Sequence, residues 1–227
     1  SINLVMIYLS LELVSIPSYI LAGILKNDKK SNEASLKYVI FGSFASGLML
    51  FGFSLLYGVS GATDIYSVHQ ALINVNNPSM ILMSIVLVLV GFGYKISMVP
   101  FHYWTPDVYE GASTPVTAFF SVAPKAAGLS IMIRFFYTVF TDSSGFSSTS
   151  VLLDVNWTLI IATLSALTMT IGNLLALYQQ NVKRMLAYSS ISHIGFILIG
   201  FCVLSYEALT SIMFYIFIYM FMNLGAF

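Results

Sequence analysis

The sequence predicts an all-α fold, a polytopic membrane helix bundle with seven transmembrane helices, on three observations. Apolar residues make up 58% of the 227 residues and charged residues only 8%, and the mean hydropathy is +0.89. About a quarter of the residues of an ordinary soluble domain are charged. Apolar stretches of about 20 residues, the length that spans a bilayer, recur along the chain. Six of the nine lysines and arginines lie in or next to alternate connections between these stretches, and the other connections contain none.

Polar segments and prolines separate the predicted helices. We place them at 2–25, 36–59, 79–99 with a short second half at 101–111, 115–140, 157–179, 185–204 and from 208 onward. The third helix is expected to break near Pro100, because proline lacks the amide hydrogen and clashes with the preceding turn. Irregular backbone at membrane depth is tolerated only against protein or a water-filled cavity, so the break indicates a functional cavity.

The basic residues predict the orientation of the bundle. They flank the first and fifth connections, whereas the polar connection at 60–78, the serine-rich connection at 141–156 and the last connection contain none. If sides alternate strictly, with the broken helix counted as one crossing, every connection that carries positive charge falls on one side. By the positive-inside rule that side is the cytoplasm or its organellar equivalent.

Three ionisable side chains interrupt the apolar segments at similar depth: Glu12, Lys95 and Lys125. Helical rise places Lys125 roughly 15 Å into its helix. Because an ionised side chain in hydrocarbon is costly, such residues usually serve a function. A carboxylate that moves relative to a buried lysine changes the lysine's proton affinity, so the trio suits a proton relay. The alternative for Glu12 and Lys95 is a static ion pair that fixes helix packing.

Two histidines and two carboxylates are further candidates, each with two readings. His102 follows the break and either passes protons onward from the relay or satisfies exposed backbone. His193 either bridges protons or is a satisfied core histidine. Asp107 and Glu110 either guide protons into the membrane or cap helix ends.

Other residues are predicted to be structural. Asp64 and His69 are expected in a solvated loop. Small residues permit close contact between membrane helices. The glycines predicted to serve that purpose are Gly42, Gly47, Gly172 and Gly195.

Several motifs are missing from the sequence. It contains no phosphate-binding glycine loop, no CxxC pair, no histidine pair at metal spacing and no nucleotide fingerprint. We therefore expect no cofactor, metal site or redox centre on this chain, and no nucleic-acid partner. Because the chain starts at Ser1 and ends within an apolar run, we also expect it to be an internal piece of a longer protein.

Long runs of the sequence resemble a known family. The chain resembles subunit N, also called subunit 2, of NADH:quinone oxidoreductase (respiratory complex I), one of the antiporter-like membrane subunits. The runs that carry the resemblance are SLELVSIPSYIL, EASLKYVIFGSFASGLMLFG, YKISMVPFHYWTPDVYEGASTPVTAFFSVAPKAAG, LTMTIGNLLAL, KRMLAYSSISHIGF and YMFMNLGAF. They are long and colinear, and together they cover nearly the whole chain.

The resemblance implies an antiporter-like inverted-repeat fold of two five-helix repeats, each with one broken helix. Residues 1–140 would be the last four helices of the first repeat, with the broken helix at 79–111. Residues 141–227 would be the first three helices of a truncated second repeat. The ionisable residue that the family carries on its second broken helix would lie beyond Phe227.

The resemblance also assigns roles. Glu12 matches the family's carboxylate, Lys95 its broken-helix lysine and Lys125 its midmembrane lysine, and His193 stands roughly where Glu12 does in the other repeat. The implied function is proton translocation through this Glu/Lys/Lys relay, coupled to quinone reduction elsewhere in the complex. The chain would then be an enzyme only as a membrane subunit of a translocase. Two alternatives are a cation/proton antiporter subunit that exchanges sodium and a structural spacer.

The implied partners are the other membrane subunits of complex I and the lipid bilayer, with quinone involved only indirectly. NADH, flavin, iron–sulfur clusters and quinone would belong to partner subunits. The expected location is a bacterial inner (plasma) membrane, with an organellar inner or thylakoid membrane as the alternative.

Overall fold

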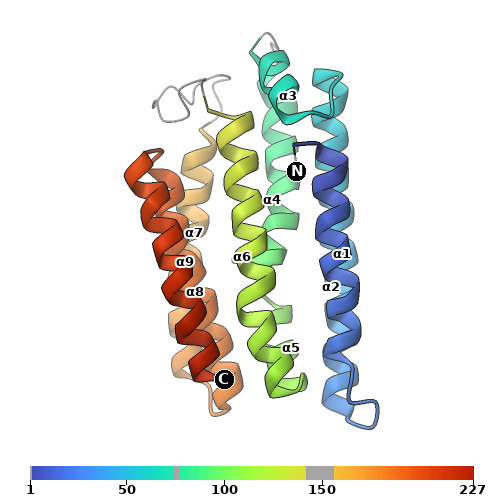
Figure 1. The fold of residues 1–227 in the computed structure, drawn as a ribbon, viewed down its shortest axis with the longest axis vertical. Coiled ribbons are helices and arrows are strands. Elements are labelled where there is room, and N and C mark those ends of the chain that lie inside the picture. The colour runs from blue at the N-terminus through green and yellow to red at the C-terminus, as the bar shows by residue number, and fades with distance from the viewer. Residues whose placement is uncertain (1, 74–76, 142–155) are drawn as a thin grey trace.

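The computed structural model describes residues 2–73, 77–141 and 156–227. Over these residues the chain is all-helical, which confirms the predicted fold class (Figure 1). Seven helices are long and apolar enough to cross a membrane, and two, α3 and α5, are short. The bounds are α1 Leu4–Ala22, α2 Lys29–Ser60, α3 Ile65–Leu72, α4 Pro78–Ile96, α5 Trp104–Gly111, α6 Thr114–Val139, α7 Trp157–Leu177, α8 Val182–Cys202 and α9 Tyr206–Ala226.

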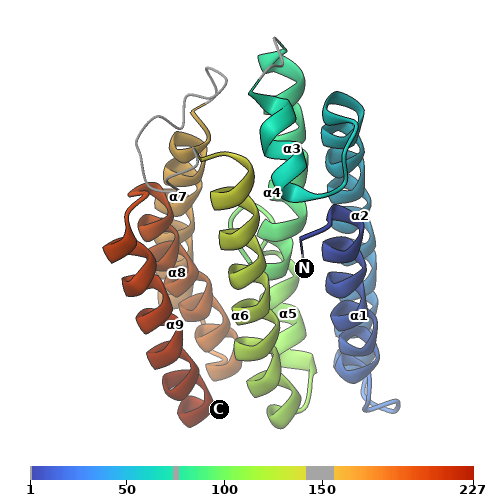
Figure 2. The same cartoon turned by 45° about the horizontal axis from the view of Figure 1, so that its top comes forward.

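The long helices lie side by side, and their connections alternate between the two ends of the bundle (Figures 1 and 2). The α1–α2, α5–α6 and α7–α8 connections lie together at the lower end in Figure 1, which we name the basic end. This arrangement agrees with the predicted alternation of sides. The basic residues in or next to these connections are Lys26, Lys29, Lys30, Lys37, Lys183 and Arg184.

Side-chain caps decide where most of the spanning helices begin. An Asn, Asp or Ser oxygen accepts a backbone N–H in the first turn of α1, α2, α4, α7, α8 and α9. The prediction for the second helix was wrong at this point. Asp28 caps α2, so the helix begins at Lys29 rather than at 36, and the polar residues assigned to a loop form its first two turns.

The connection at 60–78 contains a helix that the sequence did not predict. Helix α3 is capped by Asp64 and buries Ile65, Val68 and Leu72, a spacing that places all three on one face. His69 Nδ1 lies 3.1 Å from the carbonyl oxygen of Val139 on α6. The prediction of a solvated loop was therefore wrong for both residues. Asp64 caps α3 and His69 contacts α6, so they help to hold this end of the bundle together.

The third spanning helix breaks at Ser97, three residues before Pro100, where the break was predicted. Helix α4 ends at Ile96, Ser97 is left-handed with φ 65°, and helix resumes at α5. The Ser97 N–H still reaches the carbonyl oxygens of Gly93 and Tyr94, while the Val99 N–H donates to Thr168 Oγ1 of α7 at 3.1 Å. The irregular backbone is thus satisfied by protein, as the membrane interior requires.

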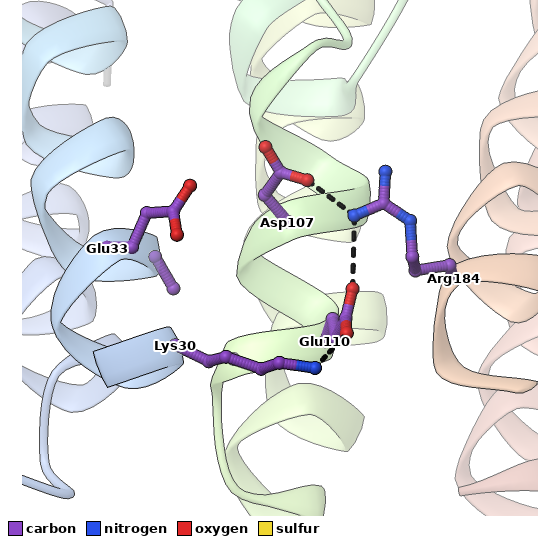
Figure 3. Close-up of a pocket in the computed structure, with 7 residues that line it drawn as sticks. Lys30, Glu33, Asp107, Glu110 and Arg184 are labelled. Carbon is purple, nitrogen blue, oxygen red and sulfur yellow. Dashed lines mark hydrogen bonds and ion pairs between the residues drawn. The ribbon is translucent and has the colours of Figure 1, made fainter. Parts of the chain in front are cut away.

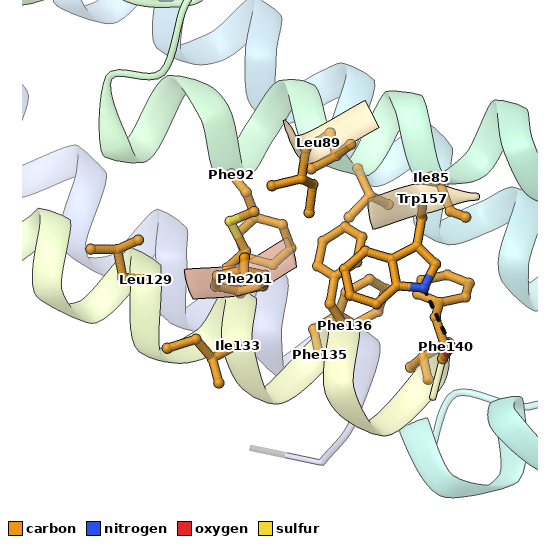
Figure 4. Packing of buried hydrophobic residues seen from close by; sticks show 14 of the residues in the cluster. Ile85, Leu89, Phe92, Leu129, Ile133, Phe135, Phe136, Phe140, Trp157 and Phe201 are labelled. Carbon is orange, nitrogen blue, oxygen red and sulfur yellow. Dashed lines mark hydrogen bonds between the residues drawn. The ribbon is translucent and has the colours of Figure 1, made fainter. Parts of the chain in front are cut away.

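Two apolar clusters surround the break. The first joins α4, α6, α7 and α8 on the side away from the basic end, and Figure 4 shows its aromatic centre around Phe136 and Trp157. The second lies toward the basic end, where Tyr38 stacks on Trp104 with ring centroids 4.4 Å apart. Lys125 lies on α6 between Phe120 of the second cluster and Leu129 of the first.

Three of the four predicted packing glycines lie at close helix contacts. A Cβ at Gly42 would overlap the Tyr19 hydroxyl, and one at Gly172 would lie 2.7 Å from the Ser192 nitrogen. A Cβ at Gly195 would lie 2.7 Å from the Met169 nitrogen. The prediction was wrong for Gly47, which has nothing within 4 Å of a Cβ position. The serine-rich connection predicted for 141–156 lies almost entirely outside the described residues.

Candidate functional site

Lys95 lies in the last turn of α4 and is held by a serine of α1. The side chain is only 5% exposed, and its Nζ donates to Ser15 Oγ at 2.8 Å. Ser15 in turn donates its own hydroxyl proton to the carbonyl oxygen of Leu11 at 2.7 Å. The serine oxygen therefore acts as an acceptor for the lysine.

Glu12 is half-buried and lies near Lys95 without pairing to it. No Glu12–Lys95 contact is among the ion pairs within 4 Å that the described residues form. Both side chains instead line one small cavity of about 10 Å³, together with Ser15, Tyr19 and other residues of α1, α2 and α4. A volume of roughly 10–15 Å³ is what a single water needs. The geometry therefore suits a contact between carboxylate and lysine through one water.

Lys125 lies in the middle of α6 and is enclosed by three helices. It is 1% exposed, and its Nζ donates to Ser190 Oγ of α8 at 2.8 Å. The same Nζ lies over the Tyr109 ring of α5, 5.4 Å from the centroid, in a cation–π arrangement. Ser190 donates its own proton to the Ala187 carbonyl oxygen at 2.8 Å. Hydroxyl and aromatic groups thus surround this lysine.

The two lysine sites are neighbours across the contact between α4 and α6. A Cβ on Gly128, one turn after Lys125, would lie 3.2 Å from Cγ of Lys95. The Lys95 stem therefore packs directly against the helix that carries Lys125. The structure brings the two predicted lysines into one region while giving each its own serine partner.

The two histidines have different surroundings. His193 lies one turn after Ser190 on α8, and its Nδ1 is 2.7 Å from the Tyr215 hydroxyl of α9. His102 is buried between α4 and α5, stacks on Tyr103 at 4.6 Å, and its Nδ1 has no hydrogen-bond partner among the described residues. His193 is thus close to the Lys125 site. Within the described ranges no hydrogen bond joins His102 to Lys95.

Ion pairs at the basic end join α2, α5 and α8, and we name this group the basic-end cluster (Figure 3). Arg184 Nη1 lies 2.5 Å from Asp107 and 3.1 Å from Glu110, while Lys37 and Lys30 reach the same two carboxylates at 2.6 Å. Most of these side chains line an open pocket of about 110 Å³.

The carboxylates of this cluster are occupied by ion pairs. Helix α5 has no side-chain cap, but Asp107 stands in its first turn, where a carboxylate interacts favourably with the helix dipole. The hydrogen bond from Lys30, together with the Arg184 guanidinium, holds the pKa of the Glu110 carboxyl below its usual value and outweighs the opposing effect of burial. Asp107 and Glu110 therefore stay ionised and connect α5 to both neighbouring helices.

Sequence reasoning missed Ser190 and Tyr109 as contacts of Lys125. One signal was available: a serine stands three residues from an ionisable residue in both Glu12/Ser15 and Ser190/His193, which puts each pair on one helix face. No comparable sequence signal exists for Tyr109, because its contact depends on how α5 docks on α6.

These observations define a polytopic membrane protein with protonatable side chains buried between its helices. The model of the family described as NADH:quinone oxidoreductase/Mrp antiporter, TM matches residues 1–227. The chain belongs to this family, which confirms the resemblance and the membrane location inferred from the sequence.

Curated relatives of the chain include two bacterial proteins. The chain is 52% identical to NADH-quinone oxidoreductase subunit N 2 of Sorangium cellulosum, over 99% of this chain and 45% of that protein. It is 48% identical to NAD(P)H-quinone oxidoreductase subunit 2 of Microcystis aeruginosa, over 99% of this chain and 42% of that protein. The chain thus spans somewhat less than half the length of these relatives.

Solved structures show the same fold. Respiratory complex I from Thermus thermophilus with bound aureothin contains a chain of TM-score 0.78 and 31% identity, covering 98% of this chain and 45% of that chain. The Mrp complex from Dietzia gives a TM-score of 0.83 at 26% identity, covering 98% of this chain and 40% of that chain. Within the described residues, no group of three or more His, Cys, Asp or Glu is placed to hold a metal ion.

Proposed function

We propose that the chain is part of a proton-translocating membrane subunit of NADH:quinone oxidoreductase. The observation that carries the proposal is the pair of buried lysines, Lys95 and Lys125, each bound to a serine hydroxyl and placed side by side across α4 and α6. The names of the curated relatives and the complex I structure support the choice of complex.

In this proposal Lys95 is the switch and Lys125 the proton carrier. Glu12 and Lys95 share a cavity large enough for about one water. A change in the distance between them alters how strongly the carboxylate stabilises the ammonium form. Because the Lys95 stem packs against α6, that change reaches Lys125, which binds or releases its proton in response. Energy for the cycle comes from quinone reduction elsewhere in the complex.

The surrounding assembly follows from the same proposal. Residues 1–140 belong to the first inverted repeat and 141–227 to the second, so that α6 and α8 meet at the junction of the repeats. NADH, flavin, iron–sulfur clusters and quinone are held by partner subunits, and the direct partners of this chain are other membrane subunits and lipid. The membrane is a bacterial inner membrane, with an organellar inner or thylakoid membrane as the alternative.

A second candidate is a subunit of a sodium/proton antiporter. The similarity to the Mrp complex structure favours it, because that fold match is as close as the match to complex I. This candidate requires sodium-dependent transport by a complex that shows no quinone reduction.

The test is carried out in the intact complex, in membrane vesicles that pump protons with NADH. Lys125→Met and Glu12→Gln are expected to lower pumping and coupled quinone reduction by about tenfold or more, since each removes a group that transfers or controls a proton. Lys26→Met is the control, because Lys26 is exposed in the α1–α2 connection. Near-normal pumping turnover in both site variants would sink the relay assignment.

A further inference from the structure

We propose that Tyr109 is a proton-relay residue whose hydroxyl passes protons between the pocket at the basic end and Lys125. This inference rests on the proposed function of Lys125 and adds the residue through which that lysine exchanges its proton. Four observations carry it: the unpartnered hydroxyl, the occupied proton of Ser190, the place of Tyr109 on α5 and the ring contact with Lys125.

The Tyr109 hydroxyl is free to accept and donate. The residue is fully buried, and its Oη makes no hydrogen bond of regular geometry among the described residues, with the Ser190 hydroxyl as a polar neighbour. A buried polar group is normally paired, and an exception in a native structure calls for an explanation. A hydroxyl has one donor and two acceptor positions, so Tyr109 Oη can accept one proton while it gives up another.

The other hydroxyl beside Lys125 is poorly suited to the task. Ser190 accepts from Lys125, but its own proton is already donated to the Ala187 carbonyl oxygen. Passing a proton onward would require breaking that backbone contact. Ser190 therefore acts as a fixed acceptor that positions Lys125. Tyr109 supplies the hydroxyl that can accept one proton and donate another.

Helix α5 joins the pocket to the lysine. Asp107 and Glu110 line the open pocket of about 110 Å³, while Tyr109, which stands between them in sequence, presents its ring to Lys125. Since a water in liquid takes roughly 30 Å³, the pocket has room for several. The Thr117 hydroxyl of α6 donates to the Tyr109 carbonyl oxygen at 3.1 Å and fixes the register of the two helices.

The proposed transfer balances without any further reactant. The phenol oxygen and Lys125 Nζ form no direct hydrogen bond in this structure, so the transfer needs one water, or a rotation of the lysine side chain, to join them. A proton arriving from the pocket binds a lone pair of the phenol oxygen as the original hydroxyl proton leaves along that link to the neutral Lys125 amine. The phenol is neutral before and after, and the amine becomes an ammonium. Release runs by the same two transfers in reverse. The other titratable neighbours of Tyr109 are Tyr38 of α2 and Tyr219 of α9.

The first test replaces the hydroxyl and keeps the ring. In the intact complex, Tyr109→Phe preserves the ring face over Lys125 and is expected to lower proton pumping per NADH by about tenfold. Electron transfer from NADH to an artificial acceptor reports normal assembly. Tyr137→Phe is the matched control, because it removes a phenol from α6 twelve residues beyond Lys125, where its ring packs on Phe201. Wild-type pumping by Tyr109→Phe overturns the inference.

The second test keeps the hydroxyl and changes only its acidity. Difluorotyrosine in place of Tyr109 preserves shape and packing. It therefore tests whether the hydroxyl relays protons even if the Tyr109→Phe variant fails to assemble. The expected result is a shift in the pH dependence of the pumping rate, and an unchanged profile overturns the relay. The two proposals fail separately: intact pumping by Lys125→Met removes the proposed function itself. Loss with Lys125→Met but not with Tyr109→Phe removes only the tyrosine step.

Discussion

The Lys95 and Lys125 sites share one design and differ in what completes it. In each, a buried ammonium donates to a serine on a neighbouring helix at 2.8 Å, and that serine gives its own proton to the backbone. Lys95 adds a small cavity lined by a carboxylate, whereas Lys125 adds an aromatic face in a closed site. The difference indicates that the pull of Glu12 on the charged Lys95 side chain can vary with their separation, while Lys125 depends on groups that accept and release protons.

Replacing each lysine by arginine should separate the two sites most strongly. Arginine stays protonated in proteins, so it preserves a charge but releases no proton. Lys125→Arg is therefore expected to lower pumping by about tenfold or more, as removal of a transferring group does. Lys95→Arg should keep most of its pumping, because the guanidinium still responds to Glu12. The measurement is proton uptake per NADH in vesicles, and equal losses in both variants would erase the distinction between carrier and switch.

Removing the serine hydroxyls should give a smaller, still unequal, effect. Ser190→Ala takes away the hydrogen-bond acceptor of a fully enclosed ammonium, at a cost of about 1–3 kcal/mol to that charged form. We expect a severalfold loss of pumping. Ser15→Ala should cost less, because the cavity beside Lys95 can admit one water in place of the hydroxyl. A larger loss with Ser15→Ala than with Ser190→Ala would contradict this account of the two environments.

The cavity itself can be tested with two glycines of α2. Gly42 lines the Glu12–Lys95 cavity, and a methyl group there would overlap the Tyr19 hydroxyl. Gly42→Ala should therefore lower the thermal stability of the complex, with overpacking worth about 1–3 kcal/mol, and slow coupled turnover. Gly47→Ala is the matched control, since nothing lies near it and alanine favours the helix by up to about 1 kcal/mol. Indistinguishable melting and turnover of the two variants would show that the cavity is not tightly packed.

The sequence alone was sufficient for the fold class and for finding the ionisable residues within the spanning helices. Charges are so unfavourable in apolar helices that Glu12, Lys95 and Lys125 stand out at once. Helix number and the alternation of ends followed from hydropathy and from the basic residues.

What the sequence could not provide was the set of contacts between helices. The serine partners of the lysines, the ring of Tyr109 and the water-sized gap between Glu12 and Lys95 depend on helix rotation and on crossing geometry. These are fixed by packing over the whole bundle rather than by any local pattern. Helix α3 was missed for a local reason, since its eight residues are too few for hydropathy to detect.

The smallest predicted effect concerns the basic-end cluster, which supports one lysine site more than the other. Asp107 pairs with Arg184 of α8 and Lys37 of α2, and its helix also carries Tyr109. Asp107→Asn should lower thermal stability by about 1 kcal/mol, because the pairs are partly exposed and screened by solvent. Glu33→Gln is the control, since Glu33 is 61% exposed and, among the described residues, forms an ion pair with Lys37 alone. If α5 and α8 hold the Lys125 site through this cluster, Asp107→Asn should add little loss in a Lys125→Met background. In a Lys95→Arg background, where Lys125 still carries protons, Asp107→Asn should lower pumping as much as it does in the wild-type complex. Equal effects in both backgrounds would mean that the cluster stabilises the bundle without favouring either lysine.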